Sequence, residues 1–302
     1  MANIIACIWD CDKTLVDGYM EDPIFKKYNV EPSEFWKESK DLVGFYEKQG
    51  VKVNPDTIYL NHFIHKTREG VFVGLNNAKL KEFGAELKFY KGIPELLRDT
   101  KGMINTNPTC EEYGIKLEHY VVSTGFAEVI KGSKLMPYLD GVWGCELIEA
   151  PDENGNLIIS EIGYTIDNTT KTRAIFEINK GIPKINVGDV NSKIPYENRR
   201  VRFENMIYIA DGPSDIPAFS VVNKNHGSTF GVYPKGDAKA MLQVDQMRND
   251  GRINMFAEAD YSEGTTAYLW ITEKIKFLAG KIIENEKNKI RASVSDAPRH
   301  LD

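Results

Sequence analysis

The sequence predicts an α/β protein with a parallel sheet and a helical segment inserted after its first strand. Three apolar runs end in polar residues, at Asp10 and Asp12, at Ser123, and at Asp211. Between the first two runs, over residues 17–90, helical patterns prevail and no strong strand pattern occurs. Because parallel strands bring their carboxyl ends to one edge of a sheet, we expect these polar residues to form one site.

Composition limits the class of protein. The chain has 302 residues, of which 42% are hydrophobic, enough for one large core or a core with a smaller domain. A formal net charge of −6 argues against a broad nucleic-acid surface. No apolar stretch reaches the length of a membrane span, and the N-terminal apolar run is too short for a signal peptide. The four cysteines lack metal-type spacing. We therefore expect a soluble, cytoplasmic protein without nucleic-acid or membrane partners.

The first strand and the insert are predicted from local patterns. Residues 4–9 are apolar and bounded by charge, as in a buried parallel strand. Within the insert, residues 33–48 are helix-like, and Asn54-Pro55-Asp56 is a helix start with Pro at the first helical position. The apolar positions of residues 60–67 then follow one helical face.

From residue 91 strands and helices alternate. The predicted strands are 119–122, 141–146, 157–160, 206–210, 229–232 and 255–259, and the predicted helices are 93–97, 126–135, 171–178, 239–248 and 265–283. Asn154-Gly155-Asn156 predicts a hairpin turn between the second and third of these strands. Residues 181–205 read as an irregular loop with a basic patch at 199–202, either functional or a surface excursion. The charged tail from residue 284 is expected to fray.

The acidic residues at the strand ends suit metal-assisted chemistry. One carboxylate of the pair Asp10 and Asp12 can act as a nucleophile or metal ligand while the other manages protons. Asp10, Asp211 and a backbone carbonyl could hold a hard divalent cation such as Mg²⁺, which prefers oxygen ligands. Taken singly, each motif could instead be a solvated turn or a helix cap.

The remaining polar residues suit an anionic phosphate. Ser123 Oγ and the amides near Thr124 and Gly125 could donate hydrogen bonds to phosphate oxygens, and Gly125 would allow close backbone approach. Lys171, at a predicted helix start, would supply a positive charge. Together with the acidic residues, this inventory predicts phosphoryl transfer, in which positioning and charge neutralisation supply most of the catalysis.

Four motifs in this order resemble a known family, the haloacid dehalogenase (HAD) superfamily of phosphatases, and within it the phosphoserine-phosphatase-like branch. The motifs are Trp9-Asp10-Cys11-Asp12-Lys13-Thr14-Leu15, Val121-Val122-Ser123-Thr124-Gly125, Lys171-Thr172-Arg173 and Ala210-Asp211-Gly212-Pro213-Ser214-Asp215. The resemblance implies a Rossmann-like, HAD-like α/β core over residues 1–16 and 91–302. It implies a helical cap domain over residues 17–90.

The resemblance also implies residue roles. Asp10 would be the nucleophile that forms an aspartyl-phosphate, and Asp12 would protonate the leaving oxygen and then activate water. Thr14 would orient Asp12, and Asp215 would anchor Lys171 or a metal-bound water. The carbonyl that completes the Mg²⁺ site would be that of Asp12.

Substrate contacts would come from the cap. The phosphoserine-phosphatase-like branch has a Glu at the cap entrance and an Arg in the cap, and the nearest positions here are Glu21 and Arg68. Tyr19 and His65 are further candidates. Cap closure would exclude water and select the substrate.

The sequence thus predicts a Mg²⁺-dependent phosphomonoester hydrolase acting on a small soluble phosphate ester. One alternative is a phosphotransferase in which an alcohol replaces water. Another is a non-catalytic binding module on a phosphatase fold, which the presence of Asp10, Asp12, Lys171 and Asp211 disfavours. The motifs define which bond is broken, whereas the molecule that carries it depends on the cap.

Overall fold

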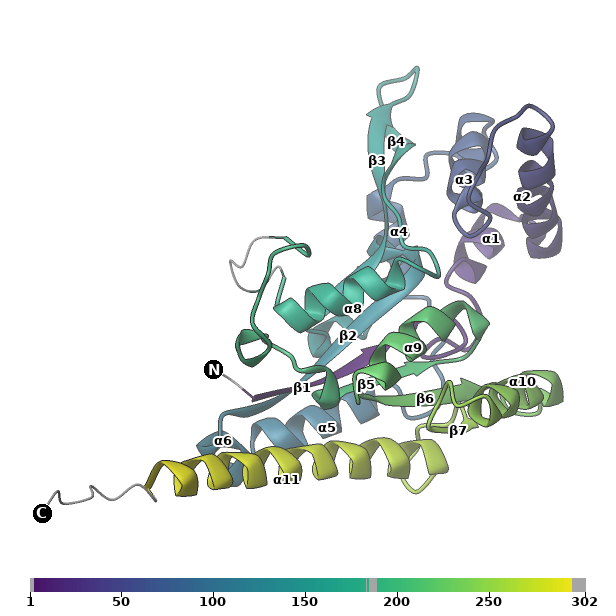
Figure 1. The fold of residues 1–302 in the computed structure, drawn as a ribbon. Helices are drawn as coiled ribbons and strands as arrows, with labels where there is room; N and C mark the ends of the chain where they lie inside the picture. The colour runs from purple at the N-terminus through teal and green to yellow at the C-terminus, as the bar shows by residue number, and fades with distance from the viewer. Residues whose placement is uncertain (1–2, 183, 185–188, 295–302) are drawn as a thin grey trace, which may run out of the picture.

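Seven strands form one sheet in the computed structural model, which describes residues 3–182, 184 and 189–294 (Figure 1). The strand order is β4-β3-β2-β1-β5-β6-β7. The strands are β1 (Asn3–Trp9), β2 (Ile115–Phe126), β3 (Gly141–Pro151), β4 (Leu157–Tyr164), β5 (Met206–Ala210), β6 (Ser228–Tyr233) and β7 (Met255–Glu258). All neighbouring pairs are parallel except the antiparallel hairpin β3–β4. The predicted α/β class is confirmed.

Helices cover both faces of this sheet (Figure 1). One face carries α5 (Glu95–Asn105), α6 (Pro108–Glu112) and α11 (Thr266–Val294). The other carries α8 (Lys171–Lys180) and α9 (Ile216–Lys224), and α10 (Ala238–Asn249) packs beside β6 and β7. The central strand β1 is therefore buried on both sides, which explains its uninterrupted apolar sequence.

The topology reverses at β1. From β1 the chain first builds outward through β2 and β3, and later returns to the other side of β1 through β5, β6 and β7. In open α/β sheets the crevice at such a reversal, beyond the carboxyl ends of the strands, is where ligands bind. β1 ends at Trp9 and β5 ends at Ala210, so Asp10 and Asp211 follow neighbouring strands at this crevice.

The segment between β1 and the first core helix is helical, as predicted. It contains α1 (Asp22–Tyr28), α2 (Pro32–Glu47), α3 (Ile58–Arg68) and α4 (Asn77–Gly84). An aromatic cluster holds these helices together, with Phe63 at its centre. The ring centroid of Phe63 lies 5.7 Å from that of Phe25, 4.6 Å from that of Phe35 and 4.9 Å from that of Phe72. The division into a core domain and a cap domain at residues 17 and 90 stays a prediction.

The hairpin β3–β4 extends away from the sheet and runs beside the inserted helices (Figure 1). Arg68 Nη2 donates a hydrogen bond of 2.7 Å to the carbonyl of Ser160, and the amide of Ile159 donates one of 2.9 Å to the carbonyl of Leu75. The sequence predicted the hairpin but not this docking, because the partners in these two contacts are 92 and 84 residues apart along the chain. The hairpin therefore supports the insert from the side of the core.

Several predicted elements differ in extent. β2 has 12 residues, many more than the predicted 119–122, and α7 (Ala127–Lys131) is shorter than the predicted helix over 126–135. The helix predicted over 93–97 continues to residue 105 as α5. α11 continues to Val294, so the expected fraying from residue 284 is wrong as far as the described residues extend. An ion pair of 2.6 Å between Lys289 and Glu286 spans one turn of this last stretch.

The loop over 181–205 contains short 3₁₀ turns at Tyr196–Asn198 and Phe203–Asn205, and residues 183 and 185–188 lie outside the described part of the chain. Its basic patch is not simply solvated. Arg200 donates to Glu118 on β2 through Nη1 at 2.6 Å and Nη2 at 2.5 Å, and Val201 is fully buried. The patch therefore ties the loop to the sheet.

Candidate active site

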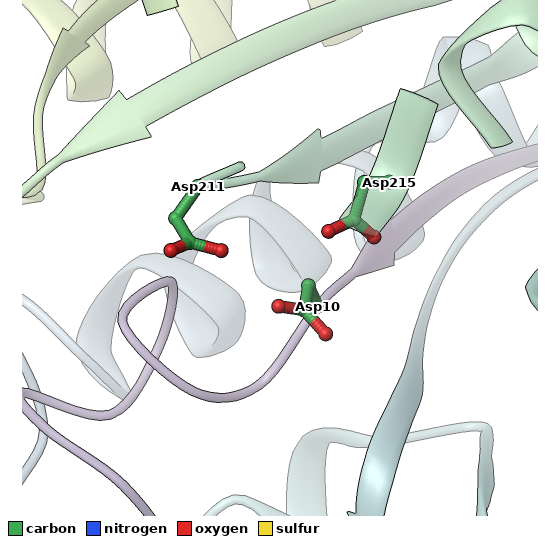
Figure 2. A group of neighbouring side chains, drawn as sticks. All are labelled: Asp10, Asp211 and Asp215. Atoms are coloured by element: carbon green, nitrogen blue, oxygen red, sulfur yellow. The ribbon is translucent and has the colours of Figure 1, made fainter. Parts of the chain in front are cut away.

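Three carboxylates and one ammonium group meet at the carboxyl ends of β1 and β5. Asp10 and Asp211 follow these strands directly, and Asp215 belongs to the turn that starts α9 (Figure 2). One oxygen from each of the three lies within 4.8 Å of the others. Lys171 reaches in from the first residue of α8, with Nζ 2.8 Å from Asp10 Oδ1 and 2.7 Å from Asp215 Oδ1. The structure thus brings together residues from three of the four motifs.

Lys171 is a fully buried cation that its two partners keep charged. Burial by itself lowers the pKa of Lys171, but the charges and hydrogen bonds of Asp10 and Asp215 raise it above the usual value for a lysine. Asp215 accepts further hydrogen bonds from Tyr208 Oη at 2.6 Å and Ser214 Oγ at 2.9 Å. Asp215 therefore binds Lys171 directly, and Tyr208 in turn holds Asp215; of the two roles predicted for Asp215, contact with a metal-bound water stays a prediction.

The other two carboxylates carry more negative charge than the structure neutralises. Burial raises the pKa of Asp10 to about 6, although Lys171 acts in the opposite direction. Burial, together with repulsion from Asp10 and Asp215, raises the pKa of Asp211 to about 8. A divalent cation between Asp10 and Asp211 would relieve this repulsion. Both residues offer hard oxygen ligands, so the donor set fits Mg²⁺.

Asp12 is held by the backbone at the start of the insert. Its Oδ1 accepts a hydrogen bond of 2.8 Å from the amide of Met20. Burial raises the pKa of Asp12 well above its usual range, with smaller contributions from Glu21 and Asp10. The expected contact with Thr14 is absent. Thr14 Oγ1 is buried and has no hydrogen-bond partner among the described residues, so Met20 rather than Thr14 orients Asp12.

The carboxyl-terminal end of β2 is packed against the same methionine. A Cβ atom on Gly125 would lie only 2.4 Å from Met20 Sδ, so a larger residue here would require the Met20 side chain to move. Ser123 is buried, and its Oγ accepts a hydrogen bond of 3.0 Å from the amide of Gly125. Thr124 and Gly125 line a cavity between core and insert, whereas Ser123 is not among its lining residues. Of the three residues predicted to donate to phosphate, Thr124 and Gly125 therefore line the cavity and Ser123 does not.

A cavity of about 270 Å³ opens above these carboxylates, between core and insert. Its lining residues are Asp10, Asp12, Lys13, Tyr19, Glu21, Trp36, Asp56, Tyr59, Thr124, Gly125, Lys171, Asp211 and Ser214. Two of the four cap candidates, Tyr19 and Glu21, are in this set. His65 and Arg68 are not.

Arg68 is the clearest correction among the predicted site residues. Its side chain is exposed and its Nη2 is bound to Ser160 on β4, so it is placed to hold the hairpin and not to read a substrate. The local sequence around Arg68 does not reveal this contact, because Ser160 lies 92 residues away along the chain.

Three lining residues of the insert escaped the sequence reasoning, namely Trp36, Asp56 and Tyr59. Tyr59 Oη donates a hydrogen bond of 2.7 Å to the carbonyl of Thr124, and Asn54 Nδ2 donates one of 2.9 Å to Asp167 Oδ2 in the turn before α8. These two contacts join the insert to the core. The only available signal was that Tyr59 lies within a helix already predicted to have one buried face.

Comparisons with known proteins give a sequence relative and a similar fold. No family model matches the chain. A protein of Borreliella burgdorferi, described as an uncharacterized protein, is 38% identical over 287 residues, which cover 90% of this chain and 97% of the relative. A HAD family hydrolase from Salmonella enterica has a TM-score of 0.51 at 14% identity, covering 85% of this chain and 67% of the other. A substrate-bound phosphoserine phosphatase has a TM-score of 0.49 at 17% identity, covering 87% and 97%.

The described helices include none that is both long enough and apolar enough to span a bilayer.

The similarity to the Salmonella hydrolase concerns the fold, and it confirms the predicted HAD-like architecture. The chain belongs to the same sequence family as the Borreliella burgdorferi protein, and it has the fold of the haloacid dehalogenase superfamily of hydrolases.

Proposed function

We propose that this protein is a Mg²⁺-dependent phosphomonoester hydrolase that works through an aspartyl-phosphate on Asp10. The observation that carries the proposal is the buried Lys171 bridging Asp10 and Asp215, with Asp211 facing them across less than 4.8 Å. A structural ion pair would need one carboxylate for one ammonium. A third carboxylate at this distance instead favours a site that receives further positive charge and an anionic substrate.

In the proposed first step, a carboxylate oxygen of Asp10 attacks phosphorus and the bond to the alcohol oxygen breaks. Lys171 holds Oδ1 of Asp10 in place. The raised pKa of Asp12 keeps a proton on its carboxyl group, which passes to the departing alcohol oxygen. In the second step the Asp12 carboxylate takes a proton from water, which attacks phosphorus and releases inorganic phosphate from Asp10.

The cation would be held by Asp10, Asp211 and the backbone carbonyl of Asp12. When bound, Mg²⁺ supplies positive charge that offsets the repulsion between nucleophile and phosphate. Both oxygens of Asp215 already accept hydrogen bonds, so Asp215 is assigned to positioning Lys171.

The substrate is a small molecule in this proposal. The cavity of about 270 Å³ lies below the roughly 300–1,000 Å³ of pockets for drug-sized ligands. The insert lines one wall of the cavity and is hydrogen-bonded to the core through Asn54 and Tyr59, which favours a small ester over a phosphorylated protein.

The test is phosphate release from a panel of phosphomonoesters with Mg²⁺, for the native protein, Asp10→Asn and the control Asp17→Asn. Asp17 is exposed and does not line the cavity. We expect Asp10→Asn to reduce turnover by at least about 10³-fold, and chelation of Mg²⁺ to abolish it, while Asp17→Asn retains it. Mass spectrometry of the quenched native enzyme should place the phosphoryl group on Asp10. Full activity of Asp10→Asn would contradict the assignment of the nucleophile.

A further inference from the structure

The two walls of the cavity differ in chemistry. The core wall contains the carboxylates of the reaction and both lysines of the lining, Lys13 and Lys171. The insert contributes a second group, here called the cap wall, which consists of Tyr19, Glu21, Trp36, Asp56 and Tyr59. The cap wall therefore has three aromatic rings, two carboxylates and no basic residue.

The aromatic rings of the cap wall form a continuous set. The ring centroid of Trp36 lies 6.4 Å from that of Tyr19 and 5.6 Å from that of Tyr59. Tyr59 is fixed by its hydrogen bond to Thr124, and Trp36 is packed edge-on against Phe35, with 5.5 Å between ring centroids. These rings are held in place before any ligand binds, which lowers the entropic cost of binding.

Glu21 adds an acidic group that forms no ion pair with a basic side chain among the described residues. Its side chain is only 3% exposed although it lines the cavity. Burial disfavours its charged form, and no basic side chain among the described residues contributes an opposing effect. A buried carboxylate in this setting is stabilised when a cationic ligand enters the cavity.

We propose that the cap wall binds a cationic ammonium group of the substrate, so that the substrate is the phosphate ester of an amino alcohol or quaternary-ammonium alcohol without a carboxylate. This inference rests on the proposed function and specifies its substrate class. Aromatic faces with nearby carboxylates are the usual receptors for alkylammonium ions. A substrate carboxylate would face Glu21 and Asp56 with no cation on the same wall to receive it.

The chain supplies an internal example of this contact. Lys13 Nζ lies 4.4 Å from the ring centroid of Tyr19, within the range of cation–π interactions. One face of this ring therefore already contacts an ammonium group at the boundary between the two walls. Because Lys13 could also pair with a substrate carboxylate, the experiment compares esters with and without one.

The experiment measures kcat/KM with Mg²⁺ for choline phosphate, its neutral isostere 3,3-dimethylbutyl phosphate, ethanolamine phosphate and serine phosphate. We expect choline phosphate to exceed the neutral isostere by at least about tenfold, and serine phosphate to be poorer than ethanolamine phosphate. Equal values for choline phosphate and its isostere would overturn the cation site. A preference for serine phosphate would overturn the exclusion of a carboxylate.

Variants assign the effect to the cap wall. Trp36→Leu and Glu21→Gln should each reduce the ratio between choline phosphate and its isostere by at least about fivefold. Phe45→Leu is the matched control, because Phe45 lies on the same helix, is 55% exposed and does not line the cavity. If Trp36→Leu fails to fold, Tyr19→Leu replaces it, because Tyr19 is 42% exposed. An unchanged ratio in these variants would contradict the proposal.

Binding separates failure of the cation site from failure of the proposed function. Calorimetric titration of Asp10→Asn with choline phosphate and with the neutral isostere requires no turnover. Tighter binding of choline phosphate by at least about tenfold, with no hydrolysis of any ester by the native enzyme, would support the cation site and refute the hydrolase. Hydrolysis of every ester without this difference in affinity would support the hydrolase and refute the cation site.

Discussion

His119 is expected to make the folded protein less stable as the pH falls below neutrality. It lies fully buried on β2, with Nδ1 3.2 Å from Trp9 Nε1 and Nε2 3.1 Å from Thr100 Oγ1. The indole nitrogen can only donate, so Nδ1 must accept and the proton must sit on Nε2. Protonating Nδ1 would turn this hydrogen bond into a contact between two donors. The native fold is therefore more stable with the neutral imidazole.

The size of the effect follows from the difference between the two states. Burial, with a smaller contribution from Lys101, lowers the pKa of His119 from 6.5 to about 3. The unfolded chain therefore binds one more proton than the folded protein between these values. The free energy of unfolding falls as the pH falls through this window, by up to about 1.4 kcal/mol per pH unit. At pH 5 the loss relative to pH 8 is about 2 kcal/mol.

The assay is urea unfolding at pH 8 and pH 5, in chelator, for the native protein and for His119→Gln. Glutamine has a donor and an acceptor but no charge in this range, so it removes the titration. Other groups, including the active-site carboxylates, titrate in both proteins and cancel in the comparison. The native protein should lose about 2 kcal/mol more than the variant. A difference below about 0.5 kcal/mol would refute the reasoning from the tautomer.

Three other outcomes follow from the structure. Gly132→Ala should destabilise the protein by about 1–3 kcal/mol or more, because a Cβ atom there would lie 1.7 Å from a backbone oxygen of α4, whereas Gly102→Ala, with open space around it, should be neutral or stabilising in thermal unfolding. Burial alone would raise the pKa of Glu118, but Arg200 and Tyr120 lower it to about 2, so its contribution to stability is present above about pH 4.5 and lost as the pH falls toward 2. In equilibrium unfolding, Arg200→Met should remove this dependence of the free energy of unfolding on pH below about 4.5. Mg²⁺ at 100 times its Kd should stabilise the native protein by about 2.7 kcal/mol in thermal denaturation, and Asp211→Asn should abolish most of this gain.

Residues fixed by strand ends were the ones that the sequence located well. Asp10 and Asp211 each follow a buried apolar run, and parallel pairing of β1 with β5 puts such endings side by side whatever the rest of the chain does. Lys171 was found for a similar reason, since the start of α8 can be recognised locally and lies at the same edge of the sheet. The fold class and the core of the site therefore depend on short-range patterns.

Residues whose role depends on a distant partner were missed or misplaced. Met20 orients Asp12 through its backbone amide, an interaction to which the identity of its side chain gives no clue. Tyr208 reads as one more apolar residue of β5, although its hydroxyl group is what fixes Asp215. Arg68 was predicted to contact the substrate because of the family resemblance. In the structure it binds Ser160 of the hairpin, whose docking was not predicted.

The same distinction separates the reaction from the choice of substrate. The carboxylates and Lys171 are placed by the sheet, so in the proposed reaction they would act on the phosphate ester of any small alcohol that fits the cavity. The cap wall is placed by the aromatic cluster around Phe63 and by the hydrogen bond from Tyr59 to Thr124, which no motif encodes. Changes at Trp36 should therefore alter which ester is preferred before they alter the bond that is broken. Changes at Lys171 should affect all esters alike.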